Sequence, residues 1–299
     1  MTTLAYLLLV TLGGYGLAVV EEWSSSGRWR PSAPLLRSVA LLARESLSPR
    51  LLDRKLFEAA PPLLLVAGVL SMAVLPLAPG VVPVELATGA LWLNAALVYV
   101  AVALLMAGWG PDAAYPMVAG FRFLGQFVAY AMLVVMPITA VAMRASSLVV
   151  GDIITSQATL WNALLQPLGF AVFLLAAMAI CYLPPFDQPV APGELAGGVV
   201  GEYTGARLVV MRLARLVLVL SLALAVTVFY LGGWLGPLLP APAWSVLKTL
   251  AVAGAMLAVG RYLPRLRTDW PLEWGWKVGI PLALLNIFWV GVVLLVADL

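Results

Sequence analysis

The sequence predicts an all-α polytopic membrane protein, a bundle of about eight transmembrane helices with one amphipathic helix at the membrane surface. Of its 299 residues, 63% are hydrophobic and 10% are charged, whereas an ordinary soluble domain carries roughly 25% charged residues. The charges gather in a few short stretches between long uncharged segments. Such a chain has too little polar surface to face water, so we expect the lipid bilayer to be its solvent.

Eight segments are long and apolar enough to cross a bilayer, which takes about 20 residues each. They are continuously rich in Leu, Ala and Val, which favours helices over the short alternating strands of a barrel. No Lys or Arg precedes Arg28, so we interpret the first segment as a retained helix rather than a secretion signal. Within a single membrane domain, 1–299, the predicted spans are about 4–20, 61–78, 86–107, 121–143, 160–183, 208–230, 244–263 and 278–297.

The first connection contains a predicted interfacial helix at about 33–46. Apolar and polar residues fall on opposite sides of this helix at helical spacing, and prolines bound it. A basic amphipathic helix commonly anchors a protein in the membrane surface, and we favour that role over a direct substrate contact. The apolar side holds Leu35, Leu36, Val39 and Leu42, the polar side Arg37, Ser38, Arg44 and Glu45.

The distribution of basic residues predicts the orientation, because cytoplasmic loops collect Lys and Arg. Fifteen of the 17 basic residues lie in or near the odd-numbered connections, and only Arg144 and Lys248 lie near the others. We therefore expect both termini outside the cell membrane and the odd-numbered loops in the cytoplasm. The net charge of +3 reflects this topology and does not indicate nucleic-acid binding.

The fifth connection carries three carboxylates beside long apolar helices: Asp187, Glu194 and Glu202. Acidic groups near the membrane interior are costly and often mark ion or proton paths. The alternative is that Asp187 and Glu194 are solvated loop charges or helix caps, and that Glu202 forms a local ion pair with Arg207.

Metal cofactors are not expected in this chain. It contains no His and a single Cys, Cys181, so the usual ligands for zinc, haem, copper and iron–sulfur clusters are missing, as is an internal disulfide.

Several segments together resemble subunit 1 of respiratory complex I, the H-type subunit in bacteria, and the equivalent subunit of energy-converting membrane-bound hydrogenases. The resemblance covers about residues 50–290, and its motifs agree in order and spacing. They are Gly108-Trp109 with Tyr115, Gly120, Arg122, Gln126 and Tyr130; Pro185-Phe186-Asp187 with Glu194-Leu195 and Glu202-Tyr203-Thr204-Gly205 with Arg207; and Leu231-Gly232-Gly233-Trp234, Trp244, Lys248, Leu263-Pro264-Arg265, Arg267, Asp269, Gly275-Trp276-Lys277, Pro281 and Asn286.

The resemblance implies a membrane-embedded subunit that is not catalytic alone. It would link a peripheral electron-transfer arm to a membrane arm and contribute to a quinone chamber and a proton or ion path. The implied partners are peripheral iron–sulfur and large hydrogenase-like subunits on the cytoplasmic side, and antiporter-like membrane subunits; a quinone would be shared with them. The implied path residues are Asp187, Glu194, Glu202, Arg122, Gln126 and Arg207, and the implied chamber or docking residues are Arg28, Trp29, Arg30, Phe186 and Tyr203.

Departures from the family pattern keep other functions open. Val190 and Pro192 stand in a loop that is usually more acidic, and Ala131 follows Tyr130 where a Glu is common. With fewer carboxylates at these positions, two alternatives stay open: an anchor or coupling subunit of a hydrogenase complex without quinone, or a purely structural anchor. A stand-alone secondary transporter is the alternative of another class, although the two halves of the chain show no clear repeat.

Overall fold

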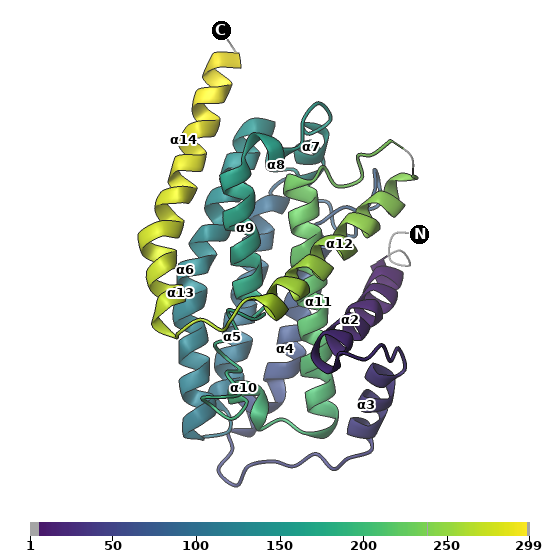
Figure 1. The fold of residues 1–299 in the computed structure, drawn as a ribbon, viewed down its shortest axis with the longest axis vertical. Helices are drawn as coiled ribbons and strands as arrows, with labels where there is room; N and C mark the ends of the chain where they lie inside the picture. Colours follow the sequence, from purple (N-terminus) through teal and green to yellow (C-terminus); the bar gives the residue numbers. More distant parts are fainter. Residues whose placement is uncertain (1–5, 238, 298–299) are drawn as a thin grey trace.

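Helices form the chain in the computed structural model, which describes residues 6–237 and 239–297. This confirms the predicted all-α membrane fold. The elements, coloured along the chain in Figure 1, are η1 (Leu9–Gly13), α2 (Gly14–Ser26), α3 (Ala33–Leu42), α4 (Arg54–Ala73), α5 (Gly89–Trp109), α6 (Ala114–Ala145), α7 (Val150–Thr155), α8 (Asn162–Leu165), α9 (Pro167–Ile180), α10 (Gly198–Gly201), α11 (Gly205–Tyr230), α12 (Ala241–Tyr262), α13 (Asp269–Trp274), η2 (Gly275–Gly279) and α14 (Ile280–Ala297).

Six helical segments of the described chain are long and apolar enough to cross a membrane: α4, α5, α6, α11, α12 and the continuous helix 269–296. The longest, α6, has 32 residues and therefore extends about 48 Å. The hydrocarbon core of a bilayer is about 30 Å thick, so one end of α6 projects beyond it. Figure 1 shows α10 beside that end and α7 and α8 at the opposite end of the bundle.

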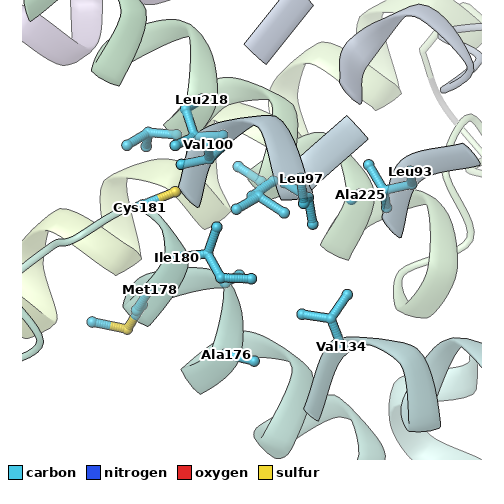
Figure 2. Packing of buried hydrophobic residues seen from close by; sticks show 14 of the residues in the cluster. Leu93, Leu97, Val100, Val134, Ala176, Met178, Ile180, Cys181, Leu218 and Ala225 are labelled. Carbon is cyan, nitrogen blue, oxygen red and sulfur yellow. The ribbon is translucent and has the colours of Figure 1, made fainter. Parts of the chain in front are cut away.

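The helix α11 forms the centre of the bundle. Every residue from 217 to 230 is buried, and α11 packs against α4, α12 and α9. Figure 2 shows its Leu218 beside Val100 and its Ala225 beside Leu93, both of α5. Because α11 is apolar on all sides in this stretch, it is satisfied only when surrounded by other helices.

Small residues allow the helices to approach closely. A Cβ on Gly68 of α4 would lie 3.3 Å from the backbone nitrogen of Leu218, and a Cβ on Gly108 of α5 would lie 2.5 Å from the carbonyl oxygen of Pro116 in α6. Van der Waals packing of this kind holds helices together in lipid, where burial of apolar surface gives no advantage over the lipid itself.

The fifth predicted span, 160–183, is interrupted. The short helix α8 is separated from the 14-residue α9 at Gln166, because the residue before a proline, here Pro167, is disfavoured in helical conformation. Side chains of α14 satisfy the freed backbone groups: the amide of Gly169 donates to the side-chain oxygen of Asn286 (3.1 Å), and the ring N–H of Trp289 donates to the carbonyl oxygen of Leu165 (3.1 Å). Such a break is tolerated in a membrane only when protein surrounds it.

The first predicted span, 4–20, begins at residues that lie outside the described chain. Its remaining part passes through η1 into α2, which continues to Ser26. The interfacial helix α3 ends at Leu42, earlier than 46, and its apolar residues Leu35, Leu36 and Val39 are exposed. An exposed apolar stripe is what a helix lying in the membrane surface requires.

Candidate functional site at the charged end of the bundle

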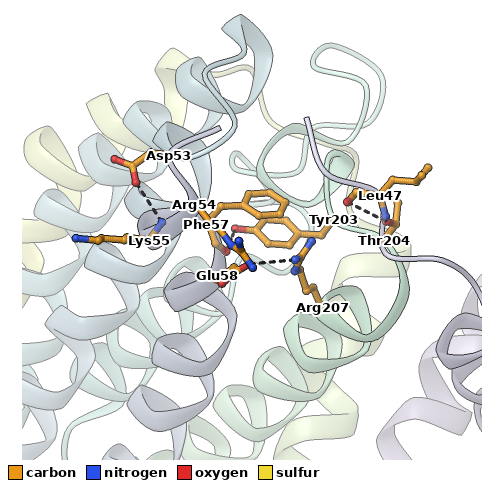
Figure 3. Close-up of polar contacts among 9 residues, drawn as sticks. All are labelled: Leu47, Asp53, Arg54, Lys55, Phe57, Glu58, Tyr203, Thr204 and Arg207. Carbon is orange, nitrogen blue, oxygen red and sulfur yellow. Dashed lines mark hydrogen bonds and ion pairs between the residues drawn. The ribbon is translucent and has the colours of Figure 1, made fainter. Parts of the chain in front are cut away.

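The loops of the odd-numbered connections are tied together at the end of the bundle that holds α10. The amide of Asp53 donates to the carbonyl oxygen of Gly110 (2.9 Å), which joins the first connection to the third. The amide of Leu47 donates to the hydroxyl of Thr204 (2.8 Å), which joins the first connection to the fifth (Figure 3). Segments far apart in the sequence thus form one surface.

Tyr203 fastens the start of α11 to the start of α4 (Figure 3). Its ring stacks on Phe57 with 4.3 Å between centroids and 6° between planes, and its hydroxyl donates to the carbonyl oxygen of Phe57 (3.0 Å). In a regular helix the amide four residues later would donate to that oxygen, but this position is Pro61, which has no N–H. Burial raises the pKa of the Tyr203 phenol, so the phenol keeps its proton at neutral pH and remains a donor.

Arg207 lies beside the same ring stack. Its guanidinium carbon is 5.3 Å from the centroid of the Phe57 ring, within the range of a cation–π contact. One guanidinium nitrogen pairs with the carboxylate of Glu58 at 3.3 Å, and Arg54 pairs with the same carboxylate at 2.9 Å. The local pairing of Glu202 with Arg207 considered above is therefore wrong: Arg207 faces α4, and among the described residues Glu202 has no ion-pair partner.

Gln126 holds the acidic connection against α6. Its side-chain amide nitrogen donates to the carbonyl oxygens of Ala179 (2.8 Å) and Phe186 (3.1 Å), and the residue is 3% exposed. Its amide oxygen is buried without a hydrogen-bond partner in the described part of the chain. A buried acceptor without a partner is costly and indicates a place where a water molecule or a ligand can donate.

Asp187 is the most buried of the three predicted carboxylates. Its side chain is 12% exposed and pairs with Arg265 of the seventh connection at 2.8 Å. Glu194 is instead 59% exposed and pairs with Arg122 of α6 at 2.7 Å. Glu202 is half-buried at the end of α10. The three carboxylates are thus distributed along the loop. Asp187 and Glu194 pair with different arginines, Arg265 and Arg122.

Arg28 and Arg30 line a cavity of about 470 Å³ at the turn between α2 and α3, together with Glu22 and Arg37. Trp29 is exposed and packs edge to face on Trp23. Phe186 lies elsewhere: it is buried, contacts Tyr130 with 5.4 Å between ring centroids, and lines a different, apolar cavity. The residues that we grouped as one chamber or docking surface are therefore divided among the Arg28 cavity, the Phe186 cavity and the Tyr203 ring stack, and their roles stay predictions.

Two partners of these residues were not among the candidates. Glu58 pairs with Arg207, and Arg265 pairs with Asp187. The sequence offered a signal for Glu58, which is an isolated carboxylate four residues after Arg54 at the edge of an apolar segment. Arg265 gave no such signal, because we interpreted it as one of several cations that set the topology.

This arrangement defines a multi-pass membrane protein in which polar loops close one end of an apolar helical bundle. A family model described as NADH dehydrogenase matches residues 24–291. The chain therefore belongs to this family, that of subunit 1 of complex I, which is the H-type subunit in bacteria.

Two relatives are similar over most of their length. The second H-type subunit of the NADH-quinone oxidoreductase of Geobacter sulfurreducens is 33% identical over 311 aligned positions, which cover 98% of this chain and 94% of the relative. The H-type subunit of the NADH-quinone oxidoreductase of Syntrophotalea carbinolica is 35% identical over 263 positions, which cover 85% and 80%. The chain is thus a complex I-like membrane subunit, and a subunit of this kind works with partner chains.

Proposed function

We propose that this chain joins a cytoplasmic electron-transfer arm to a membrane arm and contributes a proton or ion path and part of a quinone chamber. The observation that carries the proposal is the pair of buried polar groups at Gln126 and Asp187. They lie where the acidic connection meets α6 and α12, and the Gln126 amide oxygen has no hydrogen-bond partner among the described residues. Polar groups buried beside apolar helices are expensive and are therefore typical of functional sites.

The path in this proposal follows the acidic connection. Asp187 is the carboxylate nearest the apolar helices, and its ion pair with Arg265 at 2.8 Å holds it there. Gln126 positions the loop and offers an acceptor for a water molecule in the path. Arg122 holds the middle of the connection through Glu194, and Arg207 with Glu58 holds the start of α11 against α4. Glu202, which is half-buried and has no ion pair among the described residues, is the last carboxylate of this path.

The Arg28 cavity supports the quinone part of the proposal. A quinone headgroup needs a few polar groups beside an apolar environment for its tail. Arg28, Arg30 and Glu22 supply charge there, and Leu36 of the amphipathic helix supplies the apolar side. Partner subunits would complete this chamber, since the described lining comes from α2, α3 and their turn alone.

An open hollow of about 660 Å³ at the same end of the bundle supports docking of the peripheral arm. Asp53, Arg54, Lys55 and Asp112 line it together with Trp109. Interfaces that pair charges on both sides favour one orientation of the partner. We expect iron–sulfur and large hydrogenase-like subunits on this cytoplasmic surface, and antiporter-like subunits beside the helices.

The first test is purification in mild detergent, with mass spectrometry of the subunits and of any extracted quinone. A peripheral arm with quinone would support the whole proposal. A hydrogenase-like large subunit without quinone would overturn the quinone part. Recovery of the chain alone, with solute uptake when it is placed in liposomes, would overturn the subunit function in favour of a transporter.

The second test measures protons translocated per electron transferred. Asp187→Asn and Glu202→Gln are expected to lower this ratio several-fold. Glu85→Gln, an exposed carboxylate in the second connection, is the matched control and should leave the ratio unchanged. If the ratio is the same in all three variants while electron transfer continues, the proposed path is wrong.

A further inference from the structure

An apolar cavity of about 330 Å³ lies between α9, the acidic connection and the α12–α13 turn, and neither the predicted path nor the Arg28 cavity includes it. It is the cavity described above for Phe186, and from here on we call it the Trp270 cavity. Met178 and Phe186 are nearly fully buried and form its floor, whereas Leu263 and Trp270 are about half exposed and form its rim. Its volume is at the lower end of the range of ligand cavities, roughly 300–1,000 Å³.

The cavity lies at the depth where the bilayer meets water. The helix 269–296 is longer than the about 20 residues that cross the hydrocarbon core. Counted back from Val296, those residues end near Lys277, so Trp274 and Trp270 lie at the membrane boundary. Trp is enriched at this depth because its ring is apolar and its N–H is polar. These two rings stack with 6.1 Å between centroids and 19° between planes, and both line the cavity.

The rim is positively charged. The segment 261–277 contains four basic residues and two acidic ones, so its net charge stays positive even when Asp187 is counted with it. Arg265 lies between two lining residues, Pro264 and Leu266. Its side chain is half exposed although it pairs with Asp187. With five N–H donors, an Arg can hold one carboxylate and still bind a phosphate oxygen.

From this geometry we propose that the Trp270 cavity binds one acyl chain of an anionic phospholipid, with the phosphate at Arg265. The proposal goes beyond the quinone chamber and the proton path and does not depend on either. The acyl chain of a lipid without net charge would fill the cavity equally well. The headgroup of such a lipid would, however, leave the positive charge of the rim unbalanced. A bound acyl chain would contact Phe186, so the lipid would help to hold the loop that carries Asp187.

The test uses the protein in its co-purified complex, placed in nanodiscs of equal phosphatidylglycerol and phosphatidylcholine. One lipid at a time carries a photoreactive group in its acyl chain, and mass spectrometry locates the labelled peptides. Labelling of residues 259–274 should be several-fold stronger with phosphatidylglycerol. Equal labelling by both lipids, or labelling by neither, would overturn the proposal.

Variants separate the charge from the cavity. Arg265→Gln should reduce phosphatidylglycerol labelling to the phosphatidylcholine level, and Arg265→Lys should restore most of it. Leu175→Trp should fill the cavity and lower the labelling several-fold. Leu247→Trp, an exposed position on α12 outside the lining, is the matched control. Loss of the label on addition of a short-chain quinone would assign the cavity to a quinone tail and overturn the lipid site.

Discussion

The Tyr203 hydroxyl satisfies a carbonyl that a proline leaves without its helical donor. Pro61 cannot donate to the oxygen of Phe57, and Tyr203 donates to it from a position 146 residues away. The stacked rings exclude water from the same place. A residue that is one aromatic among many in the sequence therefore holds α4 and α11 together at the charged end.

Tyr203→Phe tests this role, because it keeps the stacked ring and removes the donor. We expect a loss of about 1–3 kcal/mol, the cost of a buried carbonyl left without a partner. Pro61→Ala restores a backbone donor to the same oxygen, so the double variant should recover much of the loss. If the two effects simply add, the explanation is wrong. Alkylation of Cys181, which is fully buried and the single cysteine, reports unfolding of the chain.

Gly205 begins α11 where the first connection passes over it. Its φ is +59°, and a Cβ there would lie 2.6 Å from the hydroxyl of Ser46. We expect Gly205→Ala to cost about 1 kcal/mol or more and to release the segment around Leu47, which limited trypsin digestion at Arg44 and Arg50 would detect. Gly193→Ala is the control, because a Cβ there meets nothing within 4 Å. Equal protection in both variants would contradict this role.

At the scale of the helices, close packing at Gly279 positions η2 and α14 against α6. A Cβ on Gly279 would lie 2.7 Å from Leu133 of α6, so η2 and α14 approach α6 only because that side chain is missing. The π-helical turn at 275–279 lies at this contact. Insertion of one extra residue per turn shifts the faces of α13 and α14 relative to one another.

Gly279→Val should therefore destabilise the packing of α14 on α6 by about 1–3 kcal/mol, the usual cost of overfilling a packed contact. Gly291→Val on the same helix meets nothing within 4 Å and should change little. The thermal onset of Cys181 alkylation measures both. Similar onsets for the two variants would show that the contact at Gly279 does not fix the helix.

The helices could be read from the sequence because bilayer length and apolar composition constrain them locally. Their ends were less predictable: α4 begins at Arg54 because Asp53 accepts hydrogen bonds from the amides of Lys55 and Leu56, before the apolar segment starts. The break at Gln166 depends on Asn286 and Trp289 of α14, more than 100 residues further along the chain. The candidate site residues were visible as charges, but their partners come from distant segments that only the packing brings near: Glu58 of α4 pairs with Arg207, and Arg265 of the α12–α13 connection pairs with Asp187.

For the whole molecule, the two basic residues that do not fit the charge asymmetry are held by carbonyl groups at the other end of the bundle. The Lys248 ammonium donates to the oxygens of Leu231 (2.7 Å), Gly233 (3.2 Å) and Leu235 (2.7 Å). Arg144 donates to the oxygen of Leu160 (2.8 Å) and to the side chain of Asn162 (2.6 Å). Both cations thus hold loops in place locally, and the predicted orientation depends on the remaining fifteen.

Labelling of single introduced cysteines tests this orientation. Thr159→Cys lies in an exposed turn beside α8, and Ser48→Cys lies in the exposed first connection. With a membrane-impermeant maleimide and intact cells, Thr159→Cys should label and Ser48→Cys should label only after the membrane is opened, because Lys and Arg are retained on the cytoplasmic side. Buried Cys181 should stay unlabelled in both and serves as the background. The reverse pattern would place the charged end, with Asp187 and Tyr203, outside the cell, where a cytoplasmic electron-transfer arm could not reach it.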